Sequence, residues 1–263
     1  MTLPKLTHQQ QEIIRQQYTY RFLSSTQIQK FLNHKSKGKI NEWLPDLVKK
    51  EYLQRIYDSS TFSGKNQPAV YYLGNNGIRW LKTQNGYDLA VLQKLYKDKN
   101  RSDTFISTCQ LVADICLDLK NQTNNQMSFD WATENEYANS ESLFYFTDML
   151  LGLHPHLVFT RKKNNKMSYY LLEIIPSTLP AYRVRKRIRT YLEFLTECEW
   201  IGHIPTAPEI LFVCETKELL IRSKRYAKKL LAEAEEENIH LNFAQKDNVQ
   251  KDGVMAEVWE DTE

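Results

Sequence analysis

The sequence predicts an α+β chain in two parts: a small N-terminal module of helices and a strand pair, then a larger α/β domain with a mixed sheet. Residues 25–73 hold two short helical patterns followed by two strand-like runs. Beyond residue 102, short apolar runs alternate with amphipathic helical stretches, which is typical of a sheet covered by helices. The charge balance also changes between the parts. Residues 1–101 contain 17 Lys and Arg against 7 Asp and Glu, whereas the remainder contains 18 against 25.

The N-terminal module begins with two helices. Thr7 precedes a stretch in which Ile13, Ile14 and Tyr18 recur at helical spacing, so we expect Thr7 to cap a first helix. Ser25 is the expected N-cap of a second helix, because it directly precedes another run of helical spacing. The apolar residues of this second helix are Ile28, Phe31 and Leu32.

A third helix is predicted over residues 37–50, after a turn at residues 33–36. Its apolar face is formed by Ile40, Trp43, Leu44 and Leu47. Pro45 lies inside this pattern, where it removes one backbone hydrogen bond and costs about 3 kcal/mol, so we expect a kink or an early end there. Burial of the apolar face leaves five polar side chains free near the start of the helix: Lys35, Ser36, Lys37, Lys39 and Asn41.

Residues 52–57 and 69–73 are predicted as paired strands, joined by a polar loop at residues 59–68. Helix, turn, helix and strand hairpin in this order predict a winged helix-turn-helix, whose recognition helix enters the major groove of DNA. The five polar residues would then lie at the major groove. Arg55 and Lys65 would reach phosphates or the minor groove from the wing. The alternative is a small helical unit with no role in DNA binding.

Further helices follow the wing, the second of them over residues 87–99. The polar run at residues 97–101 is the predicted domain edge, which gives a winged-helix domain at residues 1–100 and an α/β domain at residues 101–263. Ser102 then caps a long helix with one apolar stripe.

The second domain is predicted as a mixed sheet covered by helices. Strands are expected at residues 127–133, 143–153, 156–161, 168–175, 209–214, 239–244 and 254–259, and helices at residues 179–198 and 217–237. Asn164 and Asn165 suit the turn of a hairpin. Basic side chains on this hairpin and on the next helix predict a second phosphate-binding surface, unless they form a solvated face: Lys162, Lys163, Arg183 and Arg187.

The composition argues against several classes of protein. With 41% hydrophobic and 25% charged residues, the chain of 263 residues is expected to fold as a globular protein. No apolar run reaches the roughly 20 residues that span a bilayer, and the N-terminus lacks a signal-peptide pattern. We therefore expect a cytoplasmic protein with no membrane contact. The four cysteines have no CxxC spacing, which argues against a disulfide framework or a zinc ribbon.

Two carboxylates are the candidates for catalysis. Asp148 and Glu173 lie on predicted neighbouring strands, ahead of a basic helix, as in phosphodiesterases that hold Mg²⁺. The third group of such a site would stand two residues after the glutamate, and that place is Ile175. The alternative is a pair of satisfied polar groups at strand ends. His154 and His156 flank a proline that fixes a turn, so they are expected in a loop rather than at a metal.

The chain resembles the replication-relaxation family of plasmid and mobile-element proteins. The resemblance spans the N-terminal winged helix, residues 173–178 and the basic helix that follows. The Pro-Asp step of that family falls at Thr147 and Asp148, and its Glu-x-Asp-x-Gly-Thr segment falls at residues 173–178. The match departs at Thr147, Ile175 and Ser177. The resemblance implies a winged helix fused to a restriction-endonuclease-like domain, and the loss of the second acid at Ile175 argues against nuclease activity.

Three functions are therefore compatible with the sequence. The first is a non-enzymatic, sequence-specific double-stranded DNA-binding protein of plasmid or mobile-element replication, mobilisation or conjugation, of the relaxosome type and with no cofactor. Its expected partners are DNA, a relaxase or replication initiator, and a second copy of the chain in a homodimer. The second is a Mg²⁺-dependent endonuclease or nickase that uses Asp148 and Glu173. The third is a winged-helix transcriptional regulator whose α/β domain binds a small effector.

Overall fold

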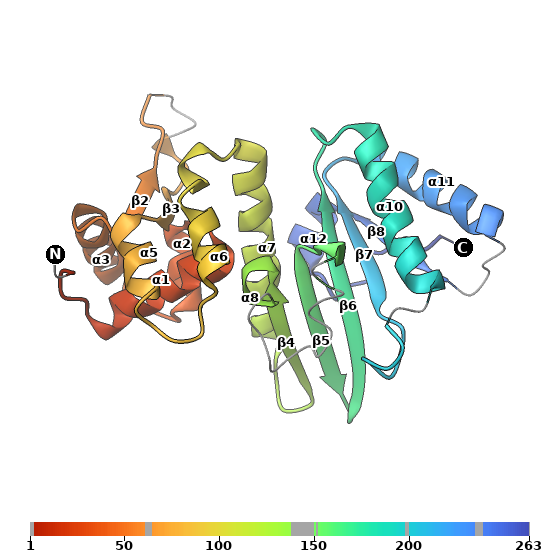
Figure 1. The fold of residues 1–263 in the computed structure, drawn as a ribbon, viewed down its shortest axis with the longest axis horizontal. Coiled ribbons are helices and arrows are strands. Elements are labelled where there is room, and N and C mark those ends of the chain that lie inside the picture. The colour runs from red at the N-terminus through yellow and green to blue at the C-terminus, as the bar shows by residue number, and fades with distance from the viewer. Residues whose placement is uncertain are drawn as a thin grey trace. The chain divides into compact units, whose positions relative to one another are not determined.

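The computed structural model describes residues 3–60, 65–137, 150, 152–197, 200–234 and 239–262. The chain divides into two compact units, Met1–Leu117 and Asp118–Glu263. The division falls inside a helix, whereas the polar run at residues 97–101 predicts it near residue 100. Each unit has its own sheet (Figure 1).

Unit 1 is built mainly of helices around a small sheet. Its helices include α1 (His8–Tyr20), α2 (Ser25–Phe31), α3 (Lys37–Lys49), α5 (Asn75–Leu81), α6 (Leu89–Leu95) and the 3-10 helix η1 (Asp98–Asn100), while α7 (Asp103–Gln122) crosses the unit boundary. Its strands are β1 (Leu23–Ser24), β2 (Leu53–Ile56) and β3 (Val70–Leu73). They pair antiparallel in the order β1-β3-β2. The predicted pairing of β2 with β3 is confirmed, and β1 is an addition.

Reciprocal caps start the first two helices. The Thr7 hydroxyl accepts the backbone N–H of Gln10, and the Gln10 side chain accepts the backbone N–H of Thr7. Ser24 and Gln27 repeat this arrangement at α2. The predicted cap at Ser25 was therefore wrong by one residue. The reason is that Gln27 stands three positions after Ser24, which is the spacing that a capping box requires.

Helix α3 continues through Pro45 and ends at Lys49. A proline inside a helix leaves the carbonyl four residues earlier without its intrahelical partner, and here that carbonyl belongs to Asn41. Asn41 and Pro45 are both exposed, so water can hydrate this carbonyl. Of the two outcomes expected at Pro45, a kink or an early end, the early end does not occur, and the helix predicted over residues 37–50 is confirmed to within one residue.

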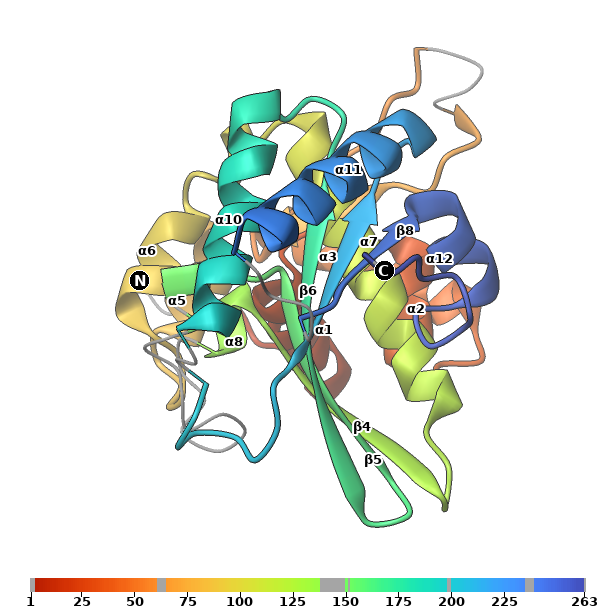
Figure 2. The ribbon, with the colours of Figure 1, turned by 90° about the vertical axis from the view of Figure 1, so that its right-hand side faces the viewer.

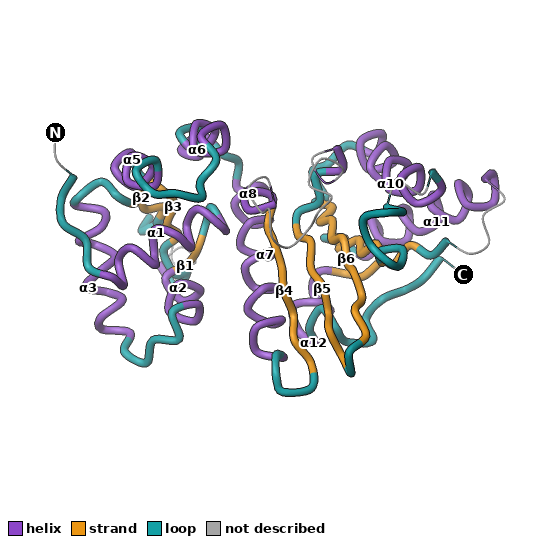
Figure 3. Tube along the Cα trace, turned by 60° about the horizontal axis from the view of Figure 1, so that its bottom comes forward, coloured by secondary structure: helices purple, strands orange, loops and turns teal. Residues whose placement is uncertain are grey.

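Unit 2 contains a five-stranded mixed sheet in the order β4-β5-β6-β7-β8. Its strands are β4 (Met127–Thr133), β5 (Leu157–Lys163), β6 (Lys166–Ile175), β7 (Glu209–Cys214) and β8 (Leu241–Gln245). The first three run antiparallel, side by side (Figure 3), and the last three run parallel. Asn164 and Asn165 form the β5–β6 turn with φ of 50° and 61°, a backbone conformation that Asn tolerates well. The predicted mixed α/β class is confirmed.

Helices cover this sheet and connect its parallel strands. The helices of unit 2 include α8 (Glu134–Tyr137), α10 (Ala181–Thr196), α11 (Lys217–Ala234) and α12 (Lys246–Asp252). Helix α10 leads from β6 to β7 and α11 from β7 to β8, and the two helices lie side by side (Figures 1 and 2). Their inner faces join a buried core that includes Ile188, Phe212 and Phe243. Within the described ranges, no helix is both long and apolar enough to cross a bilayer.

The end of the chain differs from the prediction. Residues 254–259 form no strand, and Glu260 makes a single bridge to Phe243. The backbone N–H of Val254 donates to Asp118 Oδ2 at 3.0 Å, and its carbonyl accepts the Trp259 indole N–H at 2.9 Å, so neither group is free for a ladder. Of the predicted strand at residues 143–153, positions 143–149 and 151 lie outside the described residues, and the rest is helical.

Gly77 on α5 marks a close approach between two backbone segments. A Cβ at this position would collide with the carbonyl oxygen of Tyr52, which already accepts the Gly74 N–H at 2.9 Å. We expect Gly77→Ala to lower the free energy of unfolding by about 1–3 kcal/mol, measured by urea melts followed by circular dichroism. Gly38→Ala on α3 is the control, because its Cβ would meet only Ser36 Oγ at 3.6 Å and the helix should gain about 0.5–1 kcal/mol. Equal midpoints for the two variants would contradict the close approach.

Candidate functional site

The start of α3 presents its polar residues to solvent. All five residues that we expected near its first turn are exposed: Lys35, Ser36, Lys37, Lys39 and Asn41. Ser36 caps the helix by accepting the backbone N–H of Lys39 at 3.4 Å. The Lys39 ammonium also lies 2.8 Å from Glu42 Oε2, an exposed pair of the kind that contributes little and exchanges readily with solvent. The predicted contact residues therefore lie on an outer surface of unit 1.

The opposite face of α3 fixes this orientation. Ile40, Leu44 and Leu47 are at most 1% exposed. Trp43 is half-buried beside His34, with ring centres 5.1 Å apart. Because these side chains hold α3 against unit 1, the helix cannot turn its polar start inward without losing core contacts.

The strand hairpin β2–β3 carries the remaining contacts predicted for unit 1. Arg55 is exposed on β2, and its guanidinium lies 4.5 Å from the ring centre of Tyr57. Lys65 is exposed, and its carbonyl accepts the Tyr57 hydroxyl at 3.4 Å. Tyr57 itself is 41% exposed. Residues 61–64 lie outside the described residues. The exposed Tyr57 side chain therefore contacts both Arg55 and Lys65, the two residues that were expected to supply the positive charge of the wing.

The predicted basic surface of unit 2 is only partly formed as expected. Lys162 and Lys163 are exposed at the β5–β6 hairpin, and Arg183 is exposed on α10, where its Nε donates to the Tyr182 hydroxyl at 3.1 Å. The predicted outer position of Arg187 was wrong. Its side chain is 24% exposed, and the guanidinium turns inward toward β6.

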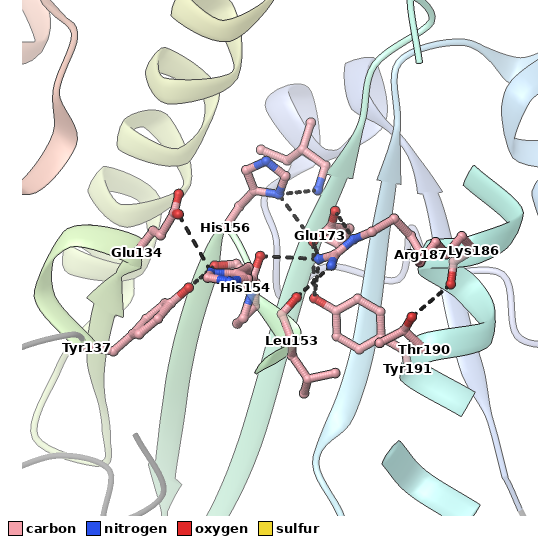
Figure 4. Close-up of polar contacts among 12 residues, drawn as sticks. Glu134, Tyr137, Leu153, His154, His156, Glu173, Lys186, Arg187, Thr190 and Tyr191 are labelled. Carbon is pink, nitrogen blue, oxygen red and sulfur yellow. Dashed lines mark hydrogen bonds and ion pairs between the residues drawn. The ribbon is translucent and has the colours of Figure 1, made fainter. Parts of the chain in front are cut away.

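Arg187 turns inward because Glu173 is buried on β6. Glu173 is 4% exposed, and a charged side chain in that position needs a partner. Arg187 Nε donates to Glu173 Oε1 at 2.9 Å and Nη2 donates to Oε2 at 2.6 Å, while the Tyr191 hydroxyl donates to Oε2 at 3.1 Å (Figure 4). Burial tends to raise the pKa of Glu173, but His156 and Arg187 outweigh it and hold the pKa below its ordinary value. Glu173 therefore stays ionised.

The Arg187 guanidinium also binds the backbone of the segment before β5. Its Nη1 donates to the Leu153 carbonyl at 2.6 Å and its Nη2 donates to the His154 carbonyl at 3.2 Å. Burial disfavours the charged form of Arg187, but the Glu173 carboxylate more than compensates and raises its pKa. Arg187 thus joins residues 153–154, β6 and α10 through one side chain.

His156 completes the cluster around Glu173. Its Nδ1 accepts the backbone N–H of Ile174 at 3.2 Å and lies 3.4 Å from Glu173 Oε2. Burial favours the neutral imidazole, but the Glu173 carboxylate outweighs this effect and raises the pKa of His156. One nitrogen cannot accept from Ile174 and donate to Glu173 at once. Protonation at Nδ1 would therefore exchange the Ile174 contact for a stronger one to Glu173.

The cluster does not fit a magnesium site. Mg²⁺ requires carboxylate oxygens that are open to it, and both Glu173 oxygens already accept from Arg187. The position two residues further on holds Ile175, which is fully buried in the core. Asp148 lies outside the described residues. Elsewhere in the described part of the chain, no three His, Cys, Asp or Glu side chains converge as metal ligands. The geometry around Glu173 is that of a structural ion pair.

Tyr191 and His156 were not predicted as partners of Glu173, although a signal existed for Tyr191. Tyr191 follows Arg187 by one helical turn, so both side chains lie on the same face of α10. Glu173 interrupts an otherwise apolar strand, which indicates a buried acid in need of a cation. His156 had no comparable signal, because its role depends on where β5 begins.

No protein-family model matches the chain. No curated protein matches it either. Among solved structures it is similar to the restriction endonuclease FokI, with 10% sequence identity, a TM-score of 0.28, and coverage of 92% of this chain and 43% of the FokI chain. This chain therefore spans less than half the length of that protein, and a TM-score this low supports no argument about function. The resemblance to the replication-relaxation family stays a prediction.

Removal of the Arg187 side chain should show how much a buried, unpaired Glu173 carboxylate destabilises the folded protein. We expect Arg187→Met to lower the free energy of unfolding by about 3–5 kcal/mol, because Glu173 would be left buried and charged. Lys186→Met is the matched control. Lys186 is the exposed neighbour of Arg187 on α10, so this substitution should change the free energy of unfolding by less than about 0.5 kcal/mol. Urea melts measure both. A loss of equal size in the two variants would count against the ion pair.

The Glu173–Arg187 pair should make the free energy of unfolding depend on pH. The pKa of Glu173 is lower in the folded protein than the ordinary value of 4.5. Its contribution to stability is therefore fully present above pH 4.5 and is lost as the pH falls through the folded pKa. We expect urea midpoints to fall on acidification below pH 4.5, and to fall less steeply in the double variant Glu173→Gln/Arg187→Met. Parallel pH curves for the two proteins would exclude this source of acid sensitivity.

Proposed function

We propose that unit 1 is a winged helix-turn-helix that binds double-stranded DNA. The observation that carries the proposal is the orientation of α3, whose apolar face is buried while the polar residues of its first turn are exposed. A helix held in this way can enter the major groove with its N-terminal end forward, where Lys and Asn side chains reach phosphates and base edges.

The charge distribution supports the same proposal. Residues 1–101 carry a formal charge of +10, from 17 Lys and Arg and 7 Asp and Glu. Attraction between such cations and DNA phosphates supplies most of the non-specific affinity of DNA-binding proteins, and this attraction weakens as salt is added. In the proposed complex, Arg55 and Lys65 contact the backbone or the minor groove from the β2–β3 wing.

The biological setting proposed for this binding rests on the family resemblance. In that setting the protein is an accessory factor of plasmid or mobile-element replication, mobilisation or conjugation, and its α/β unit is a restriction-endonuclease-like domain that serves for DNA contact or partner recruitment. A relaxase, a replication initiator or a second copy of the chain is the proposed partner. Metal-dependent nuclease activity is less well supported, because Arg187 occupies both oxygens of Glu173.

Charge reversal at the start of α3 tests the docking. We expect Lys37→Glu/Lys39→Glu to weaken binding to mixed-sequence duplex DNA at least about tenfold in gel-shift or anisotropy titrations. The plot of log affinity against log salt should become shallower by about 0.9 for each phosphate contact that is lost.

The control for this experiment changes the same total charge elsewhere in unit 1. Lys94→Glu/Lys99→Glu alters two exposed lysines on α6 and η1 and should weaken binding much less. If both double variants lose the same affinity, the effect comes from net charge alone and the docking proposal fails.

A further inference from the structure

A groove between α10 and α11 in unit 2 has no role in the function proposed above. Its volume is about 440 Å³. Apolar side chains line it from both helices, among them Val184, Ile188 and Leu219. Four cations line it as well: Arg185, Arg222, Arg225 and Lys229. The groove therefore combines an apolar lining with positive charge.

The two helices concentrate positive charge in a part of the chain that is acidic overall. Helix α10 contains five Arg and Lys and one Glu, and α11 contains six and two, which together give a formal charge of +8. Residues 102–263 as a whole have 18 Lys and Arg against 25 Asp and Glu, a formal charge of −7. Acidic residues therefore dominate outside these helices. A polyanion that approaches unit 2 is therefore attracted to α10 and α11.

Most of the groove cations remain accessible to a ligand. Arg185, Arg222 and Arg225 are exposed. Lys229 lies 3.6 Å from Glu233 in an exposed pair, which a phosphate can displace at little cost. Arg187 belongs to the buried cluster of Glu173 and does not contribute.

Aromatic side chains accompany the cations. Tyr226 lines the groove and is half-buried, with the Arg185 guanidinium 5.4 Å from its ring centre and Arg189 Nη2 donating to its hydroxyl at 3.1 Å. Tyr182, on the first turn of α10, is 66% exposed. Aromatic rings beside Arg and Lys are the surfaces on which unpaired bases stack.

The groove lies at a place in the fold where ligands commonly bind. Helices α10 and α11 follow the parallel strands β6 and β7, so both begin beyond the carboxyl ends of those strands, where ligands of open α/β sheets commonly bind. Ser177 and Thr216, which precede the two helices, line the groove. The nearby Glu215 carboxylate accepts the backbone N–H and the hydroxyl of Ser177, each at 2.6 Å, so this acid is already engaged.

We propose that the α10–α11 groove binds single-stranded nucleic acid. The rim cations hold successive phosphates, and the apolar lining with Tyr226 receives bases. A duplex keeps its bases stacked inside and would leave the apolar lining uncovered, whereas a single nucleotide would engage only part of the cations. This site is separate from α3 and does not depend on duplex binding by unit 1.

The test uses the full chain and a fluorescent oligothymidylate of about 20 nucleotides, long enough to cover a single-strand site, in anisotropy titrations. We expect Arg222→Gln/Arg225→Gln to weaken binding at least about tenfold. The dependence of log affinity on log salt should become shallower by about 0.7 for each phosphate contact that is lost. Both residues are exposed, so the variant should keep the melting temperature of the unaltered protein.

Two further variants distinguish this site from a general effect of net charge and from the duplex site on α3. Lys246→Gln/Lys251→Gln on α12 removes the same charge from unit 2 and should leave oligothymidylate binding within about twofold. Lys37→Glu/Lys39→Glu should retain oligothymidylate binding even where duplex binding is lost, so the two proposals fail independently. Unchanged oligothymidylate affinity in the groove variant would overturn the proposal. So would an equal loss of duplex affinity in that variant, or competition by thymidine monophosphate at concentrations similar to those of the oligonucleotide.

Discussion

The buried carboxylate of Glu173 is the constraint on which the arrangement of unit 2 depends. An ionised acid that is 4% exposed must be paired, and Arg187 pairs it through both oxygens. The same guanidinium binds the carbonyls of Leu153 and His154. One side chain thus connects residues 153–154, β6 and α10, which are distant in sequence. Loss of that side chain would remove the ion-pair partner of Glu173 and the donor to the Leu153 carbonyl.

This inner pair also determines which residues α10 presents outward. Consecutive residues in an α-helix are rotated by about 100°, so a side chain two positions from Arg187 points to nearly the opposite face. With Arg187 directed at Glu173, Arg185 is exposed and lines the groove beside α11. The buried ion pair therefore positions the outer charge, although the two arginines serve different purposes.

The parts of the fold that the sequence predicted well are those with strong local patterns. Strand β7 was predicted at its observed bounds because a continuous apolar run between polar residues allows few alternatives, and the β5–β6 turn followed from Asn164 and Asn165. Strand β1 has two residues, too few to show a period of two. The segment at residues 254–259 is almost continuously apolar, like a buried strand, but the Val254 N–H donates to Asp118, and this contact joins residues 136 positions apart.

The candidate site was predicted less completely, for a related physical reason. Exposure of the polar start of α3 follows from helical periodicity, which is a local property. The inward turn of Arg187 depends instead on an acid 14 residues earlier and on backbone carbonyls that no side-chain pattern encodes, so a run of arginines on a helix was an ambiguous signal.

The two proposed binding surfaces use charge in different ways, and this difference bears on specificity. The start of α3 belongs to a part of the chain with a formal charge of +10, so in the proposed complex the attraction to DNA is broad and specificity comes from side chains that reach base edges. Helices α10 and α11 are basic within an acidic unit, which limits the region where a strand can bind before any base is read. A protein with both surfaces can hold a duplex by one unit and an unpaired strand by the other. That combination suits DNA which is partly opened, because neither surface then competes for the ligand of the other.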